Sequence, residues 1–237
     1  MHDYRLAGDV YTAQVEDGVV FLNLNAGKYM GISTSQVEAL RRHVRDWPAT
    51  DDRLSAKESR PTSQPSRLIN ELVDAGILTC SEAAPKTPTP SAVTVTRSYT
   101  SWRGSQAPVT PCHVIRLVAA ILSVALLLRI GKLKFIVSLL QRTSEGAREA
   151  ADPGALRTHR ALASFFALRP WLYTARENCL FDSLVLRLFL AKSGVSSVFV
   201  IGASTRPFRA HAWVQILDCV VNDCAERVLE FTPMLFA

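Results

Sequence analysis

The sequence predicts an α+β fold divided between two domains. The chain has 237 residues, 48% of them hydrophobic, which is enough to bury a separate core in each domain. Short strands followed by helices occupy the first third, whereas apolar helices followed by paired strands occupy the second half. Residues 85–111 are rich in Pro, Ser and Thr, which is the composition of a linker, and one short strand is expected within them at 93–95. We therefore expect domains at residues 1–84 and 112–237.

The N-terminal domain is predicted to begin with a three-strand meander. Alternating apolar residues and the turn at 16–18 indicate the first two strands, and a second turn precedes the third. The predicted strands are 10–15, 18–24 and 28–32. One helix opens on a capping box at Ser35–Glu38 and runs toward Trp47, and another covers 66–75, with a short helix and loop expected at 49–65. Such a domain is winged-helix-like, and none of its residues indicates catalysis.

The second domain begins with an apolar stretch at residues 114–140. Its uncharged core, Leu117–Leu128, is twelve residues long, which is short of the roughly twenty residues that span a bilayer. We therefore expect a buried core helix that kinks or breaks at Gly131. The alternative is an interfacial helix that its flanking Arg and Lys residues draw to anionic lipid. A further helix is expected at 154–167.

A cysteine then opens the next predicted helix, residues 178–193. Asn178 is the expected N-cap, and Gly194 stands where a left-handed C-terminal cap would be. The apolar residues with helical spacing are Leu180, Phe181, Leu184, Val185, Leu188 and Phe189. Cys179 therefore lies in the first turn, where free backbone N–H groups and the helix dipole favour a thiolate. This is a suitable position for a nucleophile.

Three strands are predicted after this helix, and two of them carry the other candidate catalytic residues. The expected strands are 195–201, 210–217 and 220–224. His211 and Trp213 share a face of the second strand, and Asp223 lies on the third. For Asp223 to share that face, the hairpin needs a three-residue loop at 217–219, with Cys219 in a left-handed conformation that usually suits glycine. With this register His211 and Asp223 come within side-chain reach.

Cys179, His211 and Asp223 together suit nucleophilic catalysis. The thiolate would attack a carbonyl, the imidazole would take and return the proton, and the carboxylate would fix the imidazole tautomer. A single Cys on an apolar helix is more often a small hydrophobic residue, and a single His beside Trp is more often part of the core. The three residues in this order, on a helix start and two adjacent strands, favour the catalytic interpretation.

Four sequence motifs resemble the B proteins of lasso peptide biosynthesis. They are Asn-Cys-Leu-Phe-Asp-Ser-Leu at 178–184, Val-Ile-Gly at 200–202, Pro-Phe-Arg-Ala-His-Ala-Trp-Val at 207–214 and Val-Val-Asn-Asp at 220–223. The resemblance implies a papain/transglutaminase-like cysteine peptidase domain that removes the leader from a ribosomally made precursor. It assigns Cys179 as nucleophile, His211 as base and Asp223 as orienting acid. The chain departs from the family at Asp218-Cys219, where Asp-Gly is usual.

The same resemblance implies a PqqD-like recognition domain ahead of the peptidase. In that domain the leader peptide adds as a strand beside the third strand and lies against the last helix. The matching residues are Lys28, Tyr29 and Met30 on the strand and Leu68 and Leu72 on the helix. The unpaired groups of a strand edge would supply affinity, and apolar pockets would supply specificity.

Composition and motifs limit the other function classes. The net charge of +6 comes from residues 91–237, because residues 1–90 are slightly acidic, and the basic residues do not form a nucleic-acid-binding strip. The five cysteines contain no CxxC pair and match no zinc pattern, and there is no phosphate-binding GxxxxGK[ST] loop. We therefore expect no metal, cofactor, nucleic acid or membrane contact, and a cytoplasmic location.

The expected partners are the leader of the precursor peptide and the asparagine-synthetase-like macrolactam synthetase that closes the ring. Two alternatives remain open at this stage. A transglutaminase or N-acyltransferase would use the same triad, and a non-catalytic scaffold would only present a peptide to its partner.

Overall fold

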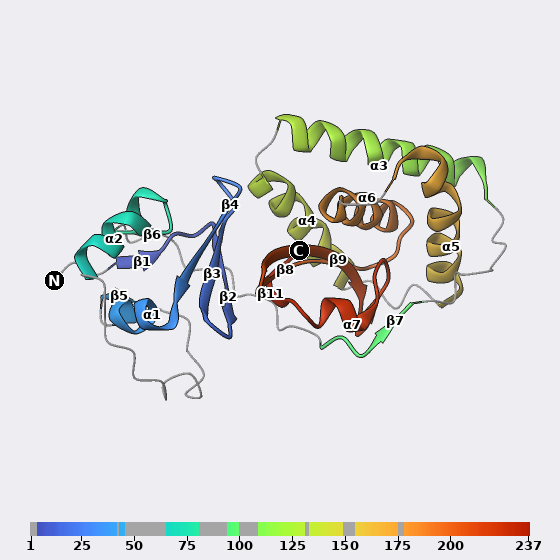
Figure 1. The fold of residues 1–237 in the computed structure, drawn as a ribbon. Coiled ribbons are helices and arrows are strands. Elements are labelled where there is room, and N and C mark those ends of the chain that lie inside the picture. The colour runs from blue at the N-terminus through green and yellow to red at the C-terminus, as the bar shows by residue number, and fades with distance from the viewer. Residues whose placement is uncertain are drawn as a thin grey trace. The chain divides into compact units, whose positions relative to one another are not determined.

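A computed structural model describes residues 4–41, 43–45, 65–80, 94–99, 109–130, 133–148, 155–174 and 178–237. Internal contacts divide the chain into two compact units (Figure 1). The first comprises residues 1–90 together with 203–209, and the second comprises residues 91–202 and 210–237. The helix and strand content is mixed α+β, as the sequence predicted.

The described part of the first unit contains two small sheets and two helices. Its elements are β1 (Tyr4–Leu6), β2 (Val10–Val15), β3 (Gly18–Asn23), β4 (Lys28–Ser33), α1 (Thr34–Arg41), β5 (Val44–Arg45), α2 (Pro65–Asp74) and β6 (Leu78–Thr79). The meander β2-β3-β4 is confirmed, with Val15 opposite Gly18 across the predicted turn. The second sheet, in the order β5-β1-β6, was not predicted, because strands of two or three residues show no period. Residues 49–64, where a short helix and loop were expected, lie outside the described residues.

The capping box of α1 lies two residues earlier than predicted. The Ser33 N–H donates to Gln36 Oε1 at 2.9 Å, and the Gln36 N–H donates to Ser33 Oγ at 3.4 Å. Two overlapping Ser-x-x-Gln/Glu matches occur here, and the earlier one caps the helix. The prediction that α1 continues past Val44 was also wrong, because the helix ends at Arg41 and Val44 belongs to β5.

The second unit packs helices against a five-stranded sheet. Its elements are β7 (Arg97–Ser98), α3 (Pro111–Ile130), α4 (Leu133–Arg148), α5 (Ala155–Leu172), α6 (Cys179–Lys192), β8 (Val198–Thr205), β9 (Phe208–Ile216), β10 (Cys219–Val220), α7 (Ala225–Val228) and β11 (Thr232–Phe236). The end of β8 and the start of β9, within residues 203–209, belong to the first unit. The strand order is β11-β8-β9-β10-β7. Figure 1 shows α3, α5 and α6 on one side of this sheet, and α3 packs along α6. This packing buries α6 between the other helices and the sheet.

The predicted linker and the α5 boundary need correction. Residues 94–96 are not a strand, and Val93 lies outside the described residues. The strand is instead β7, which pairs in parallel with β10, so this part of the predicted linker belongs to the second sheet. Helix α5 continues through Pro170 to Leu172 instead of ending at residue 167. A proline near the helix end removes one backbone bond, and the Tyr173 N–H still donates to the Arg169 carbonyl at 3.1 Å.

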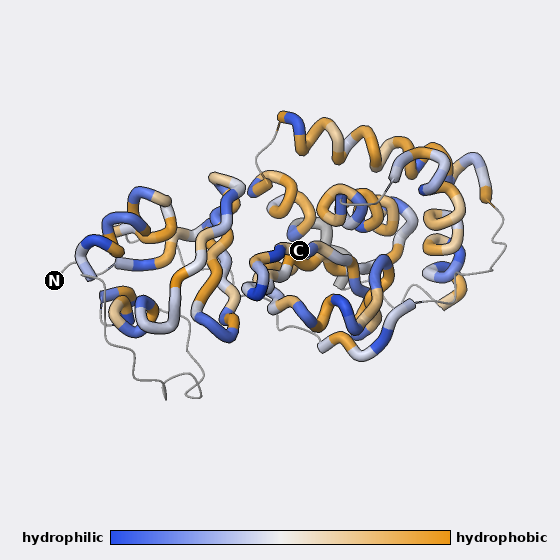
Figure 2. The backbone as a smooth tube through the Cα atoms, viewed as in Figure 1, coloured by the Kyte–Doolittle hydropathy of each residue, from blue (hydrophilic) through white to orange (hydrophobic). Residues whose placement is uncertain are grey.

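Helix α3 is not the buried core helix that the sequence predicted. By length and composition it could cross a membrane, yet only 17% of its apolar window is buried within the protein. Its buried residues, Leu117, Ala120 and Val124, form a single face. Large apolar side chains elsewhere on the helix, such as Ile115 at 67% and Leu122 at 63%, are exposed. Figure 2 shows that the hydrophobic colour continues along α3. Gly131, where a kink was expected, lies outside the described residues.

Candidate active site

Cys179 is the first residue of α6, as predicted. Asn178 precedes the helix in the N-cap position without a side-chain capping bond, and Gly194 follows its end with a φ of 71°. The helix is less amphipathic than expected, because Asp182, Ser183 and Arg187 are buried together with the apolar residues. Cys179 itself is only partly buried. The thiol therefore lies at the exposed N-terminal end of a helix whose middle is fixed by the core.

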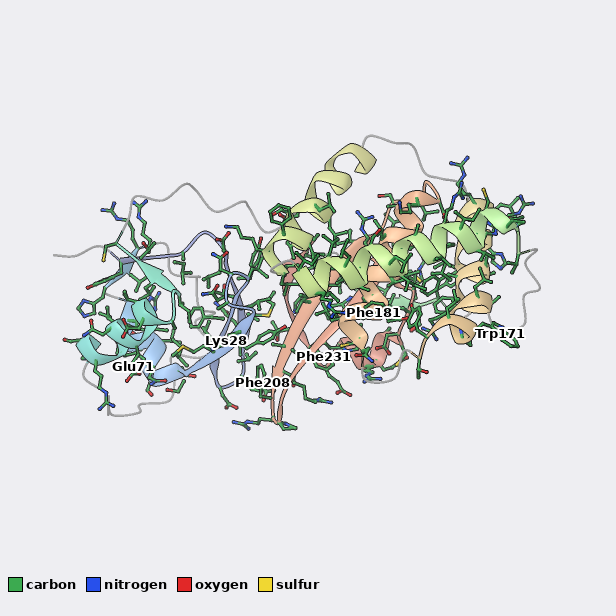
Figure 3. All side chains as sticks on the ribbon, turned by 90° about the horizontal axis from the view of Figure 1, so that it is seen from above. Lys28, Glu71, Trp171, Phe181, Phe208 and Phe231 are labelled. Atoms are coloured by element: carbon green, nitrogen blue, oxygen red, sulfur yellow. The ribbon has the colours of Figure 1, made fainter. Side chains whose placement is uncertain are left out.

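His211 lies in the middle of β9, with its side chain 8% exposed. Its ring stacks near the Trp213 ring, with centroids 6.2 Å apart, and lies 5.1 Å from the ring of Phe231, which Figure 3 labels. Trp213 in turn covers Gly202 on β8, where an added Cβ would come within 2.9 Å of the indole. The Val-Ile-Gly motif is thus explained by close packing, and the aromatic side chains limit how far the imidazole can move.

The β9–β10 hairpin differs from the prediction. Ile216 pairs with Cys219, so the loop has two residues, and the left-handed residue is Leu217 with a φ of 54° instead of Cys219. In this register a continued strand would place Asp223 on the face away from His211. The strand β10 ends at Val220, however, and although the Val221 N–H still donates to the Val214 carbonyl at 2.9 Å, residues 221–223 form a bend. This bend returns Asp223 to the imidazole.

Asp223 and His211 are in direct contact. Asp223 Oδ2 lies 2.6 Å from His211 Nε2, and Asp223 Oδ1 accepts the Cys224 N–H at 2.8 Å. Because Nε2 is engaged by the carboxylate, Nδ1 is the imidazole nitrogen that remains for the Cys179 thiol. The geometry therefore holds His211 between the other two residues.

The ionisation of the three groups follows from these contacts. A hydrogen bond with His211 lowers the pKa of the Cys179 thiol against the opposing effect of burial, and backbone groups of Ala212 and Leu180 lower it further. Burial lowers the pKa of His211, but the hydrogen bonds with Asp223 and Cys179 outweigh it and raise the pKa to about 9. Burial would raise the pKa of Asp223, yet its bonds with His211 and Cys224 lower it. These directions favour a thiolate–imidazolium pair beside a carboxylate.

A buried network that the sequence analysis missed connects the elements of this site. The Ser183 hydroxyl donates to the Ala212 carbonyl at 2.9 Å and accepts a hydrogen bond from Asn222 Nδ2 at 2.9 Å. Asn222 Oδ1 accepts the Val214 N–H at 2.8 Å, which stabilises the bend. Ser183 lies one helical turn after Cys179, Ala212 follows His211, and Asn222 precedes Asp223. The network therefore fixes the relative positions of the three catalytic candidates.

A second buried group anchors the start of α6. The Asp182 side chain accepts a hydrogen bond from the Tyr173 hydroxyl at 2.9 Å and pairs with Arg169 Nη1 at 3.3 Å. Burial, followed by the Asp182 charge and hydrogen bond, raises the pKa of Tyr173, so this phenol stays neutral. Asp182 thus has a structural partner on α5 and is not available as a second catalytic acid.

Comparison with protein families agrees with this geometry. The model of the transglutaminase-like superfamily matches residues 118–236. The chain belongs to the transglutaminase-like superfamily. This superfamily includes cysteine peptidases and transglutaminases, and its domains are typically cysteine-dependent enzymes. Comparisons with curated proteins and with solved structures give no significant match.

The residues of the predicted leader site lie in the N-terminal unit, outside the range that the transglutaminase-like model matches. Lys28, Tyr29 and Met30 lie on β4, at an edge of the meander. Lys28, which Figure 3 labels, is exposed, and the other two are partly exposed. Leu68 and Leu72 are 3% and 0% exposed in the core of the first unit. Their burial does not fit the prediction that these two leucines line a surface groove. Helical spacing identifies the face of a helix that is buried, but it does not show whether the protein core or a bound peptide covers that face.

In the described parts of the chain, no group of three or more His, Cys, Asp or Glu side chains could hold a metal ion. The five cysteines are all free thiols. Burial raises the pKa of Cys219, which lies shortly before Asp223 in the sequence.

Proposed function

We propose that this chain is a leader peptidase that processes a lasso peptide precursor. It would hold the precursor by its leader and hydrolyse the bond between leader and core, before an asparagine-synthetase-like macrolactam synthetase closes the ring. The observation that carries the catalytic part is the contact of His211 with both Asp223 and the Cys179 thiol. The motifs around these residues and the separate N-terminal unit support the choice of substrate.

The proposed reaction has two steps. The Cys179 thiolate attacks the scissile carbonyl, and free backbone N–H groups at the start of α6 stabilise the oxyanion. His211 then gives its proton to the leaving amine, which releases the core peptide and leaves the leader as a thioester. In the second step His211 deprotonates a water molecule, the water attacks the thioester, and the leader departs with a new carboxylate.

The exposed edge of β4 supports leader capture. Within the meander this strand pairs only with β3, and an extended peptide would add on its other side, where the Tyr29 ring packs against Phe208 with centroids 5.6 Å apart. Lys28, Tyr29 and Met30 on β4 are the residues that we retain for this role. Holding the leader on the same chain as the nucleophile would raise the effective concentration of the scissile bond.

Mass spectrometry of a candidate precursor incubated with the protein tests this function. We expect two fragments whose masses sum to the precursor plus one water, and no fragments with Cys179→Ala. Cys112→Ala is the matched control, because Cys112 is an exposed thiol on α3, and it should cleave normally. If an added primary amine replaces water in the leader fragment, the enzyme is an acyltransferase and the peptidase proposal is wrong. If Cys179→Ala cleaves as fast as the wild type, the triad is wrong.

A further inference from the structure

Helix α3 presents an apolar face on the outside of the second unit. Figures 1 and 3 show α3 at the outer side of this unit, with α5 and α6 behind it. Its inner face, which carries Leu117 and Val124, is buried. Large aliphatic side chains at i, i+3, i+7 and i+11 share the opposite face, where all are exposed: Ile115, Val118, Leu122 and Leu126.

This outer face lacks the polar side chains that a surface helix normally carries opposite its buried face. Between Arg116 and Arg129 the only polar side chain is that of Ser123. Its hydroxyl donates to the Ala119 carbonyl at 2.7 Å, so it is already paired within the helix. Helix α4, which packs against α3, adds the exposed side chain of Phe135. The outer face therefore offers apolar contact but no hydrogen bonds.

The charged residues on either side of this apolar face are all basic. Residues 111–144 contain five Lys or Arg residues and no Asp or Glu. Arg116 lies near the start of α3 and Arg129 in its last turn, so a cation stands toward each end of the apolar face. No ion pair in the described parts of the chain involves either arginine. The charge complement of this face is an anionic surface, whereas a second copy of the chain would bring like charges together.

The packing of α3 excludes a bilayer span. The helix is long and apolar enough to cross a membrane. However, Leu117, Ala120 and Val124 pack into the core of the second unit, and the transglutaminase-like match at residues 118–236 includes most of the helix. Crossing a bilayer would remove these residues from that core. Helix α3 can therefore meet a membrane only with its outer face, lying in the plane of the surface.

A protein partner fits the outer face less well than lipid does. The centres of protein interfaces are enriched in aromatic residues and arginine, and hydrogen bonds cross the interface around them. The centre of this face consists of Val118, Leu122 and Leu126, with no side chain that could donate or accept such a bond. Acyl chains require only apolar contact, and they adapt to the convex shape of a helix.

We propose that α3 is an interfacial helix that attaches the protein to an anionic lipid surface. Leu122 and Leu126 enter the boundary between headgroups and acyl chains, to a depth of about 5–10 Å. Arg116 and Arg129 extend along the apolar surface and bind lipid phosphates. The sequence-based expectation of no membrane contact depended on a buried α3, which the structure does not have. The proposal is independent of the proposed function, because neither the triad nor β4 takes part in it.

Flotation of the full chain with lipid vesicles tests this proposal. At low salt, vesicles of equal parts phosphatidylglycerol and phosphatidylcholine should carry the protein, and pure phosphatidylcholine should bind it at least about tenfold more weakly. Leu122→Gln and Leu126→Gln should each lower the partition coefficient about tenfold, because each removes one inserted aliphatic side chain without changing the charge. Arg129→Gln should lower it about fivefold.

Leu229→Gln is the matched control. Leu229 is 62% exposed, against 63% for Leu122, and follows α7, which Figure 1 shows on the side of the second unit away from α3. This variant should bind vesicles as the wild type does. Because all of these leucines are exposed, each variant should keep the wild-type melting temperature without vesicles, which shows that a loss of binding is not a loss of folding.

Four outcomes would overturn the proposal. Absence of flotation with the anionic vesicles at low salt would leave a protein as the partner of this face. An equal loss in Leu229→Gln and Leu122→Gln would show that binding does not pass through α3. A dimer in size-exclusion chromatography that dissociates in Leu122→Gln would assign the face to a second copy of the chain. Retention on the vesicles after an alkaline carbonate wash would indicate a bilayer span instead of an interfacial helix.

Discussion

At the residue scale, the candidate chemistry rests on how each side chain of the triad changes the protonation of its neighbour. His211 is protonated up to about pH 9 because Asp223 and the Cys179 thiolate stabilise its positive charge more than burial opposes it. The same pairing lowers the pKa of Cys179. The reactive ion pair therefore exists between a lower limit set by the thiol and an upper limit set by the imidazole.

The first prediction concerns this pH window. Reactivity should rise as pH passes through the lowered Cys179 pKa, and the ion pair should be lost as pH rises through the His211 pKa of about 9. Asp223→Asn removes the carboxylate that raises the His211 pKa, so the alkaline limit should move to lower pH. Ultraviolet absorbance of the thiolate and the pH profile of cleavage measure these limits. An alkaline limit that does not move in Asp223→Asn would mean that Asp223 does not act on His211.

The second prediction concerns Asn222, a positioning residue. Asn222→Ala removes bonds to Val214 and Ser183, so the bend that carries Asp223 should loosen. Cleavage should fall roughly 10-fold to 100-fold, as for a small misplacement of catalytic groups. The alkaline limit of the pH profile should shift in the same direction as in Asp223→Asn. Asn25→Ala, an exposed turn residue, is the control, and an equal loss in both variants would contradict the assignment.

The sequence motifs predict the triad residues but not the geometry that joins them. Cys179 and His211 are recognisable from a helix start and a strand pattern. The sequence analysis paired Asp223 with His211 correctly, but with an incorrect hairpin loop. The alternation of side chains along a strand does not show that β10 ends at Val220. The contacts of Asn222 were invisible to sequence reasoning, since they depend on which turn of α6 faces β9.

At the scale of single elements, α3 shows how composition can mislead. Its residues are apolar all round, so the sequence does not distinguish the face that packs against α6 from the face that does not. Only tertiary contacts select Leu117, Ala120 and Val124 as the buried residues. The exposed residues of the helix form an apolar surface without any acidic side chain.

The third prediction compares the two faces of α3. Leu117→Ala should lower the free energy of unfolding by about 2–5 kcal/mol, because Leu117 is fully buried. Leu122→Ala should change it by no more than about 0.5 kcal/mol, because Leu122 is 63% exposed. Urea unfolding of both variants measures the difference. A large loss in Leu122→Ala would show that the outer face is covered.

At the scale of the whole molecule, the proposed leader capture and the proposed cleavage belong to different units of the chain. The order of strands and helices in the N-terminal unit was largely predictable from turn residues and alternation. The small sheet of β1, β5 and β6 was not, and neither was the inclusion of β7 in the second sheet.

The fourth prediction is that the two activities separate. Lys28→Glu and Tyr29→Ala should weaken binding of the precursor to the β4 edge, and neither should change the alkylation rate of Cys179. Arg67→Ala on the exposed face of α2 is the control and should leave both unchanged. Fluorescence anisotropy with a labelled leader measures binding. Wild-type binding by both β4 variants would show that the leader binds elsewhere.

Competitive alkylation of all five thiols shows whether Cys179 is an activated thiolate. At slightly acidic pH, peptide mapping after brief treatment with iodoacetamide should find Cys179 modified first, although Cys80, Cys112 and Cys224 are more exposed. His211→Ala should abolish this preference and leave the other thiols unchanged. Modification of Cys179 no faster than the exposed thiols, or a preference that persists in His211→Ala, would contradict the account.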